Sequence, residues 1–225
     1  MEMKKLLIIG LIVGIVLISG CITEEQESQK EESISEDCFI KIPKTIKLLA
    51  LEAYPSSVVD SDYIEVHLPK NLCILSYPPE IEGYYVVQFR GPIYEEYKDQ
   101  IRLLGAIVHD YIPENAFIVK MNESTREEVQ NLEIVRWIGL YQPAYKMQPS
   151  LINSLNRTGD MPLTVLIFSG ENMTDIANKI DSPSGATATT SKIRILIDAS
   201  KIPDIANIIG VQFIEEYRIP QLSTS

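Results

Sequence analysis

The sequence predicts an α+β fold in which the order strand–helix–strand–strand–helix–strand occurs twice, behind a small β-rich segment. Between residues 84 and 147 the spacing of apolar residues changes from strand-like to helical and back, in that order. A weaker copy of the pattern begins near Leu163. Leu132–Ile138 also aligns with Ile208–Ile214, which favours a duplication. Because this order is typical of ferredoxin-like domains, the expected architecture is two such domains in tandem.

The first copy is expected at residues 83–147. Its strands, rich in aromatic and β-branched residues, are expected at 84–89, 106–112, 116–121 and 134–140. Its helices are indicated by apolar residues at helical spacing, namely Tyr94, Tyr97, Ile101 and Leu104, then Val129 and Leu132. Gly105 has the position of a left-handed cap after the first helix. Ser124 and Glu127 have capping-box spacing, which predicts that the second helix begins there.

The second copy is expected at residues 162–225, after a linker at 148–161 that contains Pro and Asn. Its strands are expected at 163–168, 186–190, 193–197 and 211–216. Asn172 has the position of an N-cap for the first helix. The second helix is indicated by an apolar stripe from Ile202 to Ile209 and should end at Gly210.

Residues 38–82 are the least regular part of the chain. Phe39–Ile42 and Tyr63–Leu68 alternate like half-buried strands, and five prolines interrupt the rest. Residues 47–53 fit either a short helix or a third strand. We expect a small β-rich lead-in that packs on the next domain.

Residues 1–20 have the features of a secretion signal. Lys4 and Lys5 precede an unbroken apolar run, Leu6–Ile18, which has the length of a signal-peptide core and is short for a membrane span. The run ends in Leu-Ile-Ser-Gly-Cys21, which resembles the lipobox of membrane lipoproteins. That resemblance implies cleavage before Cys21 and lipidation of its thiol, and therefore a location on the cell membrane, facing the exterior. The alternative is an uncleaved signal anchor.

Residues 21–37 have the composition of a tether. Ile22–Asp37 is rich in Glu, Ser and Gln and has few apolar residues, so we expect it to be disordered. This segment contributes much of the net charge of −11. An acidic chain of this kind argues against nucleic-acid binding, which requires a basic surface.

The remaining cysteines, Cys38 and Cys73, have two interpretations: a disulfide formed in an oxidising compartment, or two buried thiols. Because the cysteines and histidines lack paired spacing, we expect no metal site, and nothing in the sequence indicates a cofactor. Glycosylation sequons begin at Asn122, Asn156 and Asn172. Asn156, in the linker, is the strongest candidate.

Catalytic chemistry is not expected. The two histidines, His67 and His109, both fall in predicted strands, and neither has a glycine-flanked serine nearby. We interpret His109 as a structural residue of the sheet. There is no glycine loop of the type that binds phosphate. The prediction is therefore a protein that is not an enzyme.

Three segments, Val86–Ile93, Asp110–Phe117 and Val135–Lys146, resemble the prodomain region of secreted subtilisin-like serine proteases. The likeness covers the first copy well, the second weakly and residues 1–82 not at all. It implies a ferredoxin-like module that helps its protease to fold and inhibits it. In such a module the sheet face packs on the enzyme and the C-terminal tail lies in the substrate cleft.

If this resemblance extends to the tail, residues 217–225 would bind the protease through Tyr217, Ile219, Pro220 and Leu222, with 141–147 as an internal counterpart. The chain has no catalytic motif of such a protease. Two functions are open. The first is a non-catalytic cell-surface binding or scaffold module that holds another envelope protein, and the alternative is a trans-acting inhibitor or folding chaperone of a subtilisin-like protease.

Overall fold

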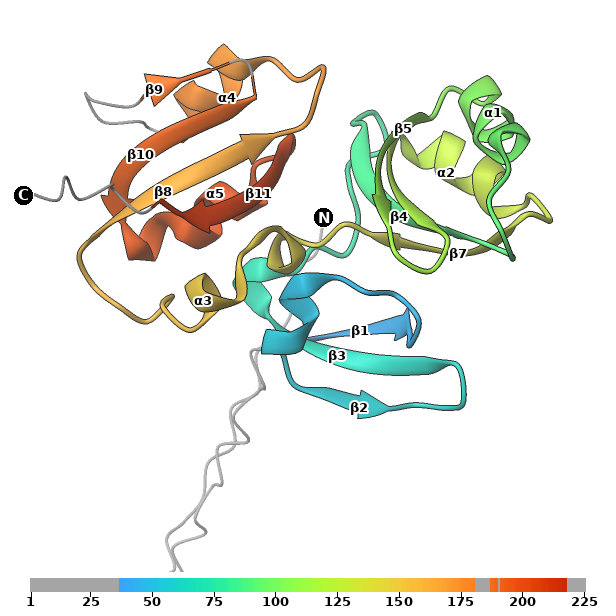
Figure 1. Ribbon diagram of the computed structural model, residues 1–225, viewed down its shortest axis with the longest axis horizontal. Helices are drawn as coiled ribbons and strands as arrows, with labels where there is room; N and C mark the ends of the chain where they lie inside the picture. Colours follow the sequence, from blue (N-terminus) through green and yellow to red (C-terminus); the bar gives the residue numbers. More distant parts are fainter. Residues whose placement is uncertain (1–36, 181–186, 190, 218–225) are drawn as a thin grey trace, which may run out of the picture. The chain divides into compact units, whose positions relative to one another are not determined.

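The computed structural model describes residues 37–180, 187–189 and 191–217, which belong to one compact unit (Figure 1). The fold is mixed α+β, with three antiparallel sheets and several helices. The predicted class is therefore confirmed. The described residues contain no helix long and apolar enough to cross a membrane.

The N-terminal region, residues 37–82, contains a three-stranded sheet. Its strands are β1 (Asp37–Pro43), β2 (Ser56–Val58) and β3 (Tyr63–Pro69), in the order β1-β3-β2. Two 3-10 helices, η1 (Leu49–Ala53) and η2 (Lys70–Leu72), follow β1 and β3. Residues 47–53 therefore do not contain the third strand, which lies further along the chain as β2. The buried Ala50 anchors η1 in the core.

The central region, residues 83–147, contains the second sheet. Its elements are β4 (Gly83–Phe89), α1 (Glu95–Leu103), β5 (Ile107–Ile112), β6 (Ala116–Met121), α2 (Glu123–Gln130) and β7 (Val135–Leu140). The strand order is β5-β6-β4-β7. Glu114 and Asn115, with φ of 69° and 64°, form the tight turn between β5 and β6. Gly105, with φ of 94°, ends α1 as predicted.

Strand β4 is buried along its whole length. Tyr85, Val87 and Phe89 belong to the same core as Ile101 of α1 and Val129 of α2, so this face of the sheet is covered by the two helices. Tyr84 and Val86, on the other face, belong to a second core, which contains residues of the N-terminal and C-terminal regions. Burial of both faces explains why the sequence of β4 is apolar almost throughout.

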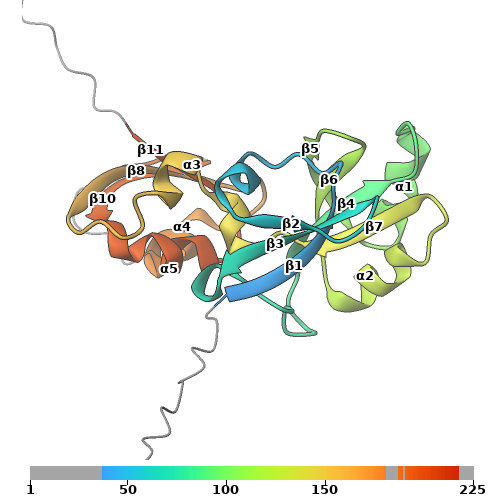
Figure 2. The same ribbon diagram turned by 90° about the horizontal axis from the view of Figure 1, so that it is seen from below.

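The C-terminal region contains the third sheet. Its elements are β8 (Asp160–Ile167), α4 (Met173–Lys179), β9 (Thr187–Ala188), β10 (Lys192–Asp198), the 3-10 helix η4 (Ala199–Lys201), α5 (Ile202–Asn207) and β11 (Val211–Glu216). The strand order is β11-β8-β10-β9. Figure 2 shows α4 and α5 together on one side of this sheet.

The linker differs from the prediction. It contains a short helix, α3 (Pro149–Ile152), and β8 begins at Asp160 rather than after residue 161. The preceding residues form a 3-10 helix, η3 (Pro143–Lys146), and every residue from 141 to 147 is buried. This segment is part of the core because its aromatic and aliphatic side chains pack against all three regions.

The start of α2 also differs from the prediction. The N-cap is Asn122, whose Oδ1 accepts a hydrogen bond of 2.9 Å from the backbone N–H of Thr125. Ser124 and Glu127 lie inside the helix instead. The buried Met121 ends β6, and the chain turns into the helix at the next residue.

Candidate functional site

A cavity of about 290 Å³ lies beside the edge strand β7 in the central region. It is lined by Leu75 and Ser76 from the segment after η2, by Tyr85 of β4, and by side chains of α2 and β7. Leu75 is 84% exposed at the rim. Four separate segments of the chain therefore form one opening at the edge of a sheet.

The polar side chains of the cavity bind one another. The hydroxyl of Tyr85 donates to Oε2 of Glu123 over 3.2 Å, and Nε of Arg126 donates to Oε1 of Glu123 over 2.8 Å. Burial, followed by the nearby carboxylate of Glu123, raises the pKa of Tyr85. The hydrogen bond to Glu123 raises the pKa of Arg126. The charges of the pair therefore largely cancel, and the group offers hydrogen bonds without a nucleophile.

The edge of β7 presents backbone groups next to this cavity. Tyr141 N–H donates to Tyr84 O over 2.9 Å, just beyond the register in which Leu140 faces Tyr85 and Gly139 faces Val86. Because hydrogen-bonded pairs alternate in an antiparallel ladder, the N–H and C=O groups of Ile138 and Leu140 point away from β4. Neither residue has a hydrogen-bonded backbone partner on that side among the residues that the structure describes. The chain's own segment before β4 meets the end of this edge at Gln142, where Ile74 N–H donates to Oε1 over 2.8 Å and Nε2 donates to Ile74 O over 3.0 Å.

A second polar group lies on the other face of the central sheet. Glu171 accepts from the Tyr84 hydroxyl over 2.6 Å and pairs with Lys120 Nζ over 2.8 Å. Burial by itself raises the pKa of Glu171, but the hydrogen bonds from Lys120 and Tyr84 bring it below its ordinary value. Phe168 stacks on Tyr84, with ring centroids 3.9 Å apart. These contacts join the central region to the C-terminal region.

His109 lies beside this group, with its ring centroid 5.4 Å from that of Tyr84 and 5.0 Å from that of Phe168. Its Nε2 is buried and has no hydrogen-bond partner among the described residues. Burial lowers the pKa of His109, so the neutral ring is favoured at neutral pH. His67, in β3, packs edge-on against Phe39 at 4.6 Å. Both imidazoles thus pack against aromatic rings.

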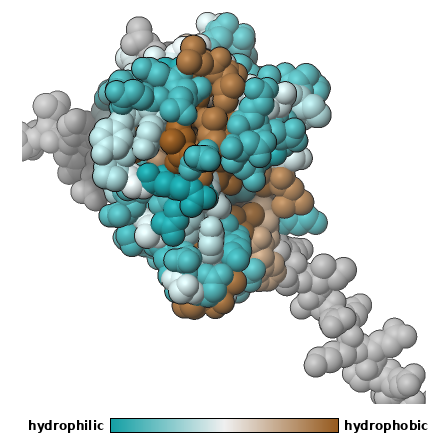
Figure 3. Space-filling model, turned by 90° about the vertical axis from the view of Figure 1, so that its right-hand side faces the viewer, coloured by the Kyte–Doolittle hydropathy of each residue, from teal (hydrophilic) through white to brown (hydrophobic). Residues whose placement is uncertain are grey.

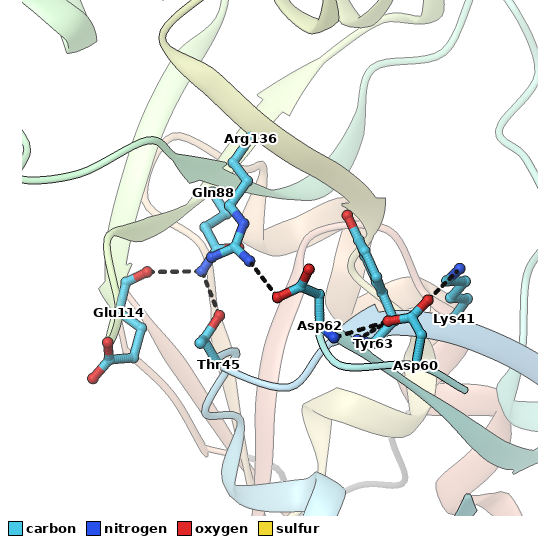
Figure 4. Close-up of polar contacts among 8 residues, drawn as sticks. All are labelled: Lys41, Thr45, Asp60, Asp62, Tyr63, Gln88, Glu114 and Arg136. Atoms are coloured by element: carbon cyan, nitrogen blue, oxygen red, sulfur yellow. Dashed lines mark hydrogen bonds and ion pairs between the residues drawn. The ribbon is translucent and has the colours of Figure 1, made fainter. Parts of the chain in front are cut away.

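The N-terminal sheet is attached to the same face of the central sheet through Gln88 (Figure 4). Nε2 of Gln88 donates to Oγ1 of Thr45 and to the backbone oxygen of Glu114, each over 2.9 Å. Nearby, Arg136 pairs with Asp62 over 3.7 Å. Gln88 is only 2% exposed, so this face of the central sheet is not available to a partner.

Among the lysines and arginines of the described residues, Lys146 has the most strongly shifted pKa. It is 3% exposed, and its Nζ donates to the backbone oxygen of Ile208 over 3.1 Å. Burial lowers the pKa of Lys146 to about 7. An amine with such a pKa is nucleophilic at neutral pH. Because Lys146 lies in the closed core, however, no substrate reaches it.

Apolar side chains also reach the surface near α1 and β5. Leu103 is 87% exposed and Ile107 is 49% exposed. Figure 3 shows one face of the molecule, on which hydrophobic residues form a strip among mostly hydrophilic ones. Neither residue lines the cavity beside β7, which combines an opening with a strand edge, so that cavity is the better candidate site.

A further cavity of about 420 Å³ lies in the N-terminal region, between η1 and the start of β3. Ile46, Leu48 and Leu51 form its apolar wall, and Lys44 and Lys47 lie at its margin. It offers apolar contact and charges of both signs, because Glu52 also lines it, and its one strand residue, Ile64, belongs to the central strand β3. Its chemistry is therefore less specific than that of the cavity beside β7.

The structure describes some of the candidate site residues that the sequence indicated. It joins Cys38 to Cys73 in a disulfide, with Cα atoms 6.3 Å apart. Asn156 is exposed in the turn after α3. The Oδ1 atoms of Asn122 and Asn172 both accept from helix N-termini. Cys21 and the tail residues Ile219, Pro220 and Leu222 lie outside the described residues.

Tyr217 is the one residue of the expected tail that the structure describes. Its N–H donates to Pro162 O over 2.8 Å, and the guanidinium of Arg194 lies 4.5 Å from its ring centroid. Tyr217 therefore continues the pairing of β11 with β8. The expected internal counterpart, 141–147, is buried and cannot enter a protease cleft without unfolding of the core.

The cavity beside β7 was not predicted from the sequence. Its residues come from four segments that no sequence pattern connects, although Ile138, Gly139 and Leu140 lie in one of the segments that resemble protease prodomains. The one local signal is the alternation of β7, which places Ile138 and Leu140 on the same face. That pattern predicts a strand, but it does not identify which strand lies at the edge.

A family model described as "Domain of unknown function (DUF8729)" matches residues 59–142. The matched segment extends from the N-terminal region through β7 and so contains every residue that lines the cavity. No curated protein and no solved structure matches the chain.

Proposed function

We propose that this chain is a non-catalytic, lipid-anchored protein that binds another protein of the cell envelope outside the cytoplasmic membrane. The observation that carries the binding role is the cavity of about 290 Å³ beside a free sheet edge. The lipobox ending at Cys21 supports the anchor. The disulfide between Cys38 and Cys73 supports an oxidising location, because such bonds are rare in cytosolic proteins.

We further propose that the central and C-terminal regions are two ferredoxin-like domains related by duplication. In each region the strands, numbered by their place in the chain, lie in the order fourth, first, third, second. A register shift interrupts the pairing of the fourth strand with the first in both regions, at Arg136 and at Gln212. These two residues occupy equivalent positions in the alignment of Leu132–Ile138 with Ile208–Ile214.

Equivalent hydrogen bonds flank the shift. On one side, Arg90 N–H donates to Ile134 O, and Phe168 N–H donates to Gly210 O. On the other side, Tyr141 N–H donates to Tyr84 O, just as Tyr217 N–H donates to Pro162 O. A bulge with the same neighbours at the same aligned position is better explained by duplication than by chance, since bulges are retained within families.

The second candidate is a trans-acting inhibitor or chaperone of a subtilisin-like protease. The specific observation in its favour is the sheet face of the C-terminal region opposite α4 and α5, where Arg194 is exposed and Leu196 is 54% exposed. The corresponding face of the central sheet is covered. A protease would therefore dock on the C-terminal region, next to Tyr217.

The anchor is tested by fractionation of cells that express Cys21→Ala. We expect this variant to leave the membrane fraction or to keep its signal segment, because the thiol that receives the lipid is gone. Ser19→Ala, which keeps a small residue before the cysteine, is the matched control. An unchanged mature mass and an unchanged membrane fraction in Cys21→Ala would contradict the anchor.

The protease candidate is tested by titration of the full-length protein, in detergent, into active subtilisin-like proteases. Slow-dissociating inhibition that is lost on deletion of residues 217–225 would support this candidate. An intact, folded protein that inhibits none of them would leave the binding module as the function.

A further inference from the structure

We propose that the free edge of β7 accepts an extended segment of a partner polypeptide as an additional, parallel strand, with an uncharged aliphatic side chain of that segment in the adjoining cavity. The inference deepens the proposed binding function and rests on it. It identifies the ligand by its conformation and its side-chain chemistry.

The C-terminal region shows what such an occupant looks like. There the outer edge of β11 carries residues 147 and 148, which approach it in parallel orientation. Gln148 N–H donates to Ile214 O over 2.9 Å, and the side-chain oxygen of Gln148 accepts from Glu216 N–H over 3.3 Å. A short extended segment thus binds the Ile214 carbonyl through its main chain and the Glu216 N–H through a side chain.

The edge of β7 has the same groups without an occupant among the described residues. In the alignment of the two regions, Ile138 corresponds to Ile214, and Leu140 corresponds to Glu216. The carbonyl of Ile138 and the N–H of Leu140 therefore have the positions that Gln148 binds in the C-terminal region. Both residues line the cavity of about 290 Å³.

The main chain of an added strand can bind these groups at any sequence, so specificity comes from the cavity. Its walls include Leu75, Ile138 and Leu140, which favour an aliphatic side chain. Glu123 and Arg126 already neutralise each other, and a charged ligand group would be buried there without a free counter-charge. A volume near the lower limit of about 300 Å³ for ligand sites suits one side chain better than a larger molecule.

The residues of β7 also do not prevent another strand from pairing with its edge. Proteins commonly block exposed edges with proline, with inward-pointing charges or with bulges. The bulge of β7 lies at Arg136, before the regular pairing of residues 137–140 with β4. From Val135 to Leu140, β7 contains no proline, and Arg136 is its one charged residue. Arg136 is paired with Asp62 of the N-terminal region. An open, unblocked edge is an expected feature of a strand that accepts another.

The test uses the full-length protein in detergent and a random seven-residue peptide library displayed on phage. Selected peptides are then synthesised and their affinities are measured for three forms: the wild type, Leu140→Pro and Leu140→Ala. Proline removes the outward N–H of residue 140, which an edge strand tolerates. Alanine shortens the same side chain at least as much as proline does, but it keeps the N–H.

We expect the selected peptides to be extended and rich in aliphatic residues. Their affinity should fall at least about tenfold in Leu140→Pro, which corresponds to about 1.4 kcal/mol, and by a smaller factor in Leu140→Ala. Leu75→Asp, a change at an 84% exposed side chain that leaves the fold intact, should weaken binding about fivefold or more. Amide exchange at Leu140 should slow when a peptide is bound.

Failure to enrich any peptide, or equal affinity for the wild type, Leu140→Pro and Leu75→Asp, would overturn strand addition at β7. Cross-linking on intact cells separates that failure from failure of the binding function. A partner captured equally by wild type and Leu140→Pro would mean that the protein binds elsewhere. Protection of Leu140 in the free protein would show that its own chain fills the edge, which also overturns the proposal.

Discussion

At the scale of single residues, Lys146 makes an unusual contribution to stability. Its pKa is about 7 in the folded protein because of burial, whereas an unfolded lysine has a pKa of about 10.4. Between these values the unfolded chain binds more protons than the folded one. The free energy of unfolding therefore rises with pH across this window, and it is lowest where Lys146 is charged in both states.

We predict that the wild type gains on the order of a few kcal/mol in the free energy of unfolding between pH 7 and pH 9.5. Lys146→Met should remove most of this slope and should be more stable than the wild type at pH 7. Denaturant titrations at several pH values measure both effects. The exposed Lys179, changed to Met, is the control, and it should keep the wild-type slope. If the free energy of unfolding of Lys146→Met rises with pH as steeply as that of the wild type, Lys146 is not the cause of the rise.

At higher pH, two buried tyrosines make the free energy of unfolding fall again. Burial raises the pKa of Tyr141 and of Tyr145 well above the ordinary value of about 10. Above pH 10 the unfolded chain loses the phenolic protons while the folded one keeps them, so stability falls again. The optimum should lie between these two transitions.

Lys146 also illustrates what the sequence does not contain. Lysine is almost never fully buried, and no apolar period in Pro143–Met147 indicates that this segment lies in the core. Its burial depends on contacts with residues such as Ile208, which lies 62 positions away. The pairing of Glu171 with Tyr84 spans 87 positions. Periodicity reports the local environment of a residue and carries no information on such partners.

At the scale of elements, prediction was most successful for two short strands that contain aliphatic and aromatic residues. The strand at 116–121 and the strand at 211–216 have the limits that their patterns predicted. The start of α2 was misplaced by two residues, because Asn122 and Ser124 are both good N-caps. What decides between them is the end of the preceding strand, at the buried Met121.

The N-cap of α2 can be tested with two matched substitutions. We predict that Asn122→Ala lowers the free energy of unfolding by about 1 kcal/mol, because it removes the acceptor for Thr125 N–H. Ser124→Ala should change it by less than about 0.5 kcal/mol. Both substitutions destroy the same glycosylation sequon, so loss of a glycan affects them equally. Equal effects in chemical denaturation would contradict the cap assignment.

The disulfide acts on the elements of the N-terminal region. It joins β1 to the segment after η2 and closes a separation of 35 residues. We predict that Cys38→Ala lowers the free energy of unfolding by about 3 kcal/mol. A reducing agent should lower the stability of the wild type but not that of Cys38→Ala. A non-reduced digest should contain a linked pair of peptides with Cys38 and Cys73, and free thiols in both would contradict the bond.

At the scale of the whole molecule, the two hydrophobic cores differ in how many regions of the chain contribute residues to them. One core contains the fully buried Val129 and belongs to the central region, with Tyr77 at its margin. The other contains Val66 of the N-terminal region, Val86 of the central sheet and Leu163 of the C-terminal region. The second core therefore couples three parts of the chain that sequence patterns would divide into separate domains.

This difference predicts which parts unfold together. Leu163→Ala and Val129→Ala both remove fully buried side-chain atoms, and the change at Leu163 should cost about 2 to 5 kcal/mol. Because Leu163 belongs to the shared core, its truncation should speed amide exchange in β3, although β3 lies about a hundred positions earlier in the chain. Val129→Ala should speed exchange mainly in α1, α2 and the strands that they cover. If Leu163→Ala leaves exchange in β3 unchanged while it destabilises β8 and β10, the regions unfold independently. The N-terminal sheet would then be a separate domain that only touches its neighbours.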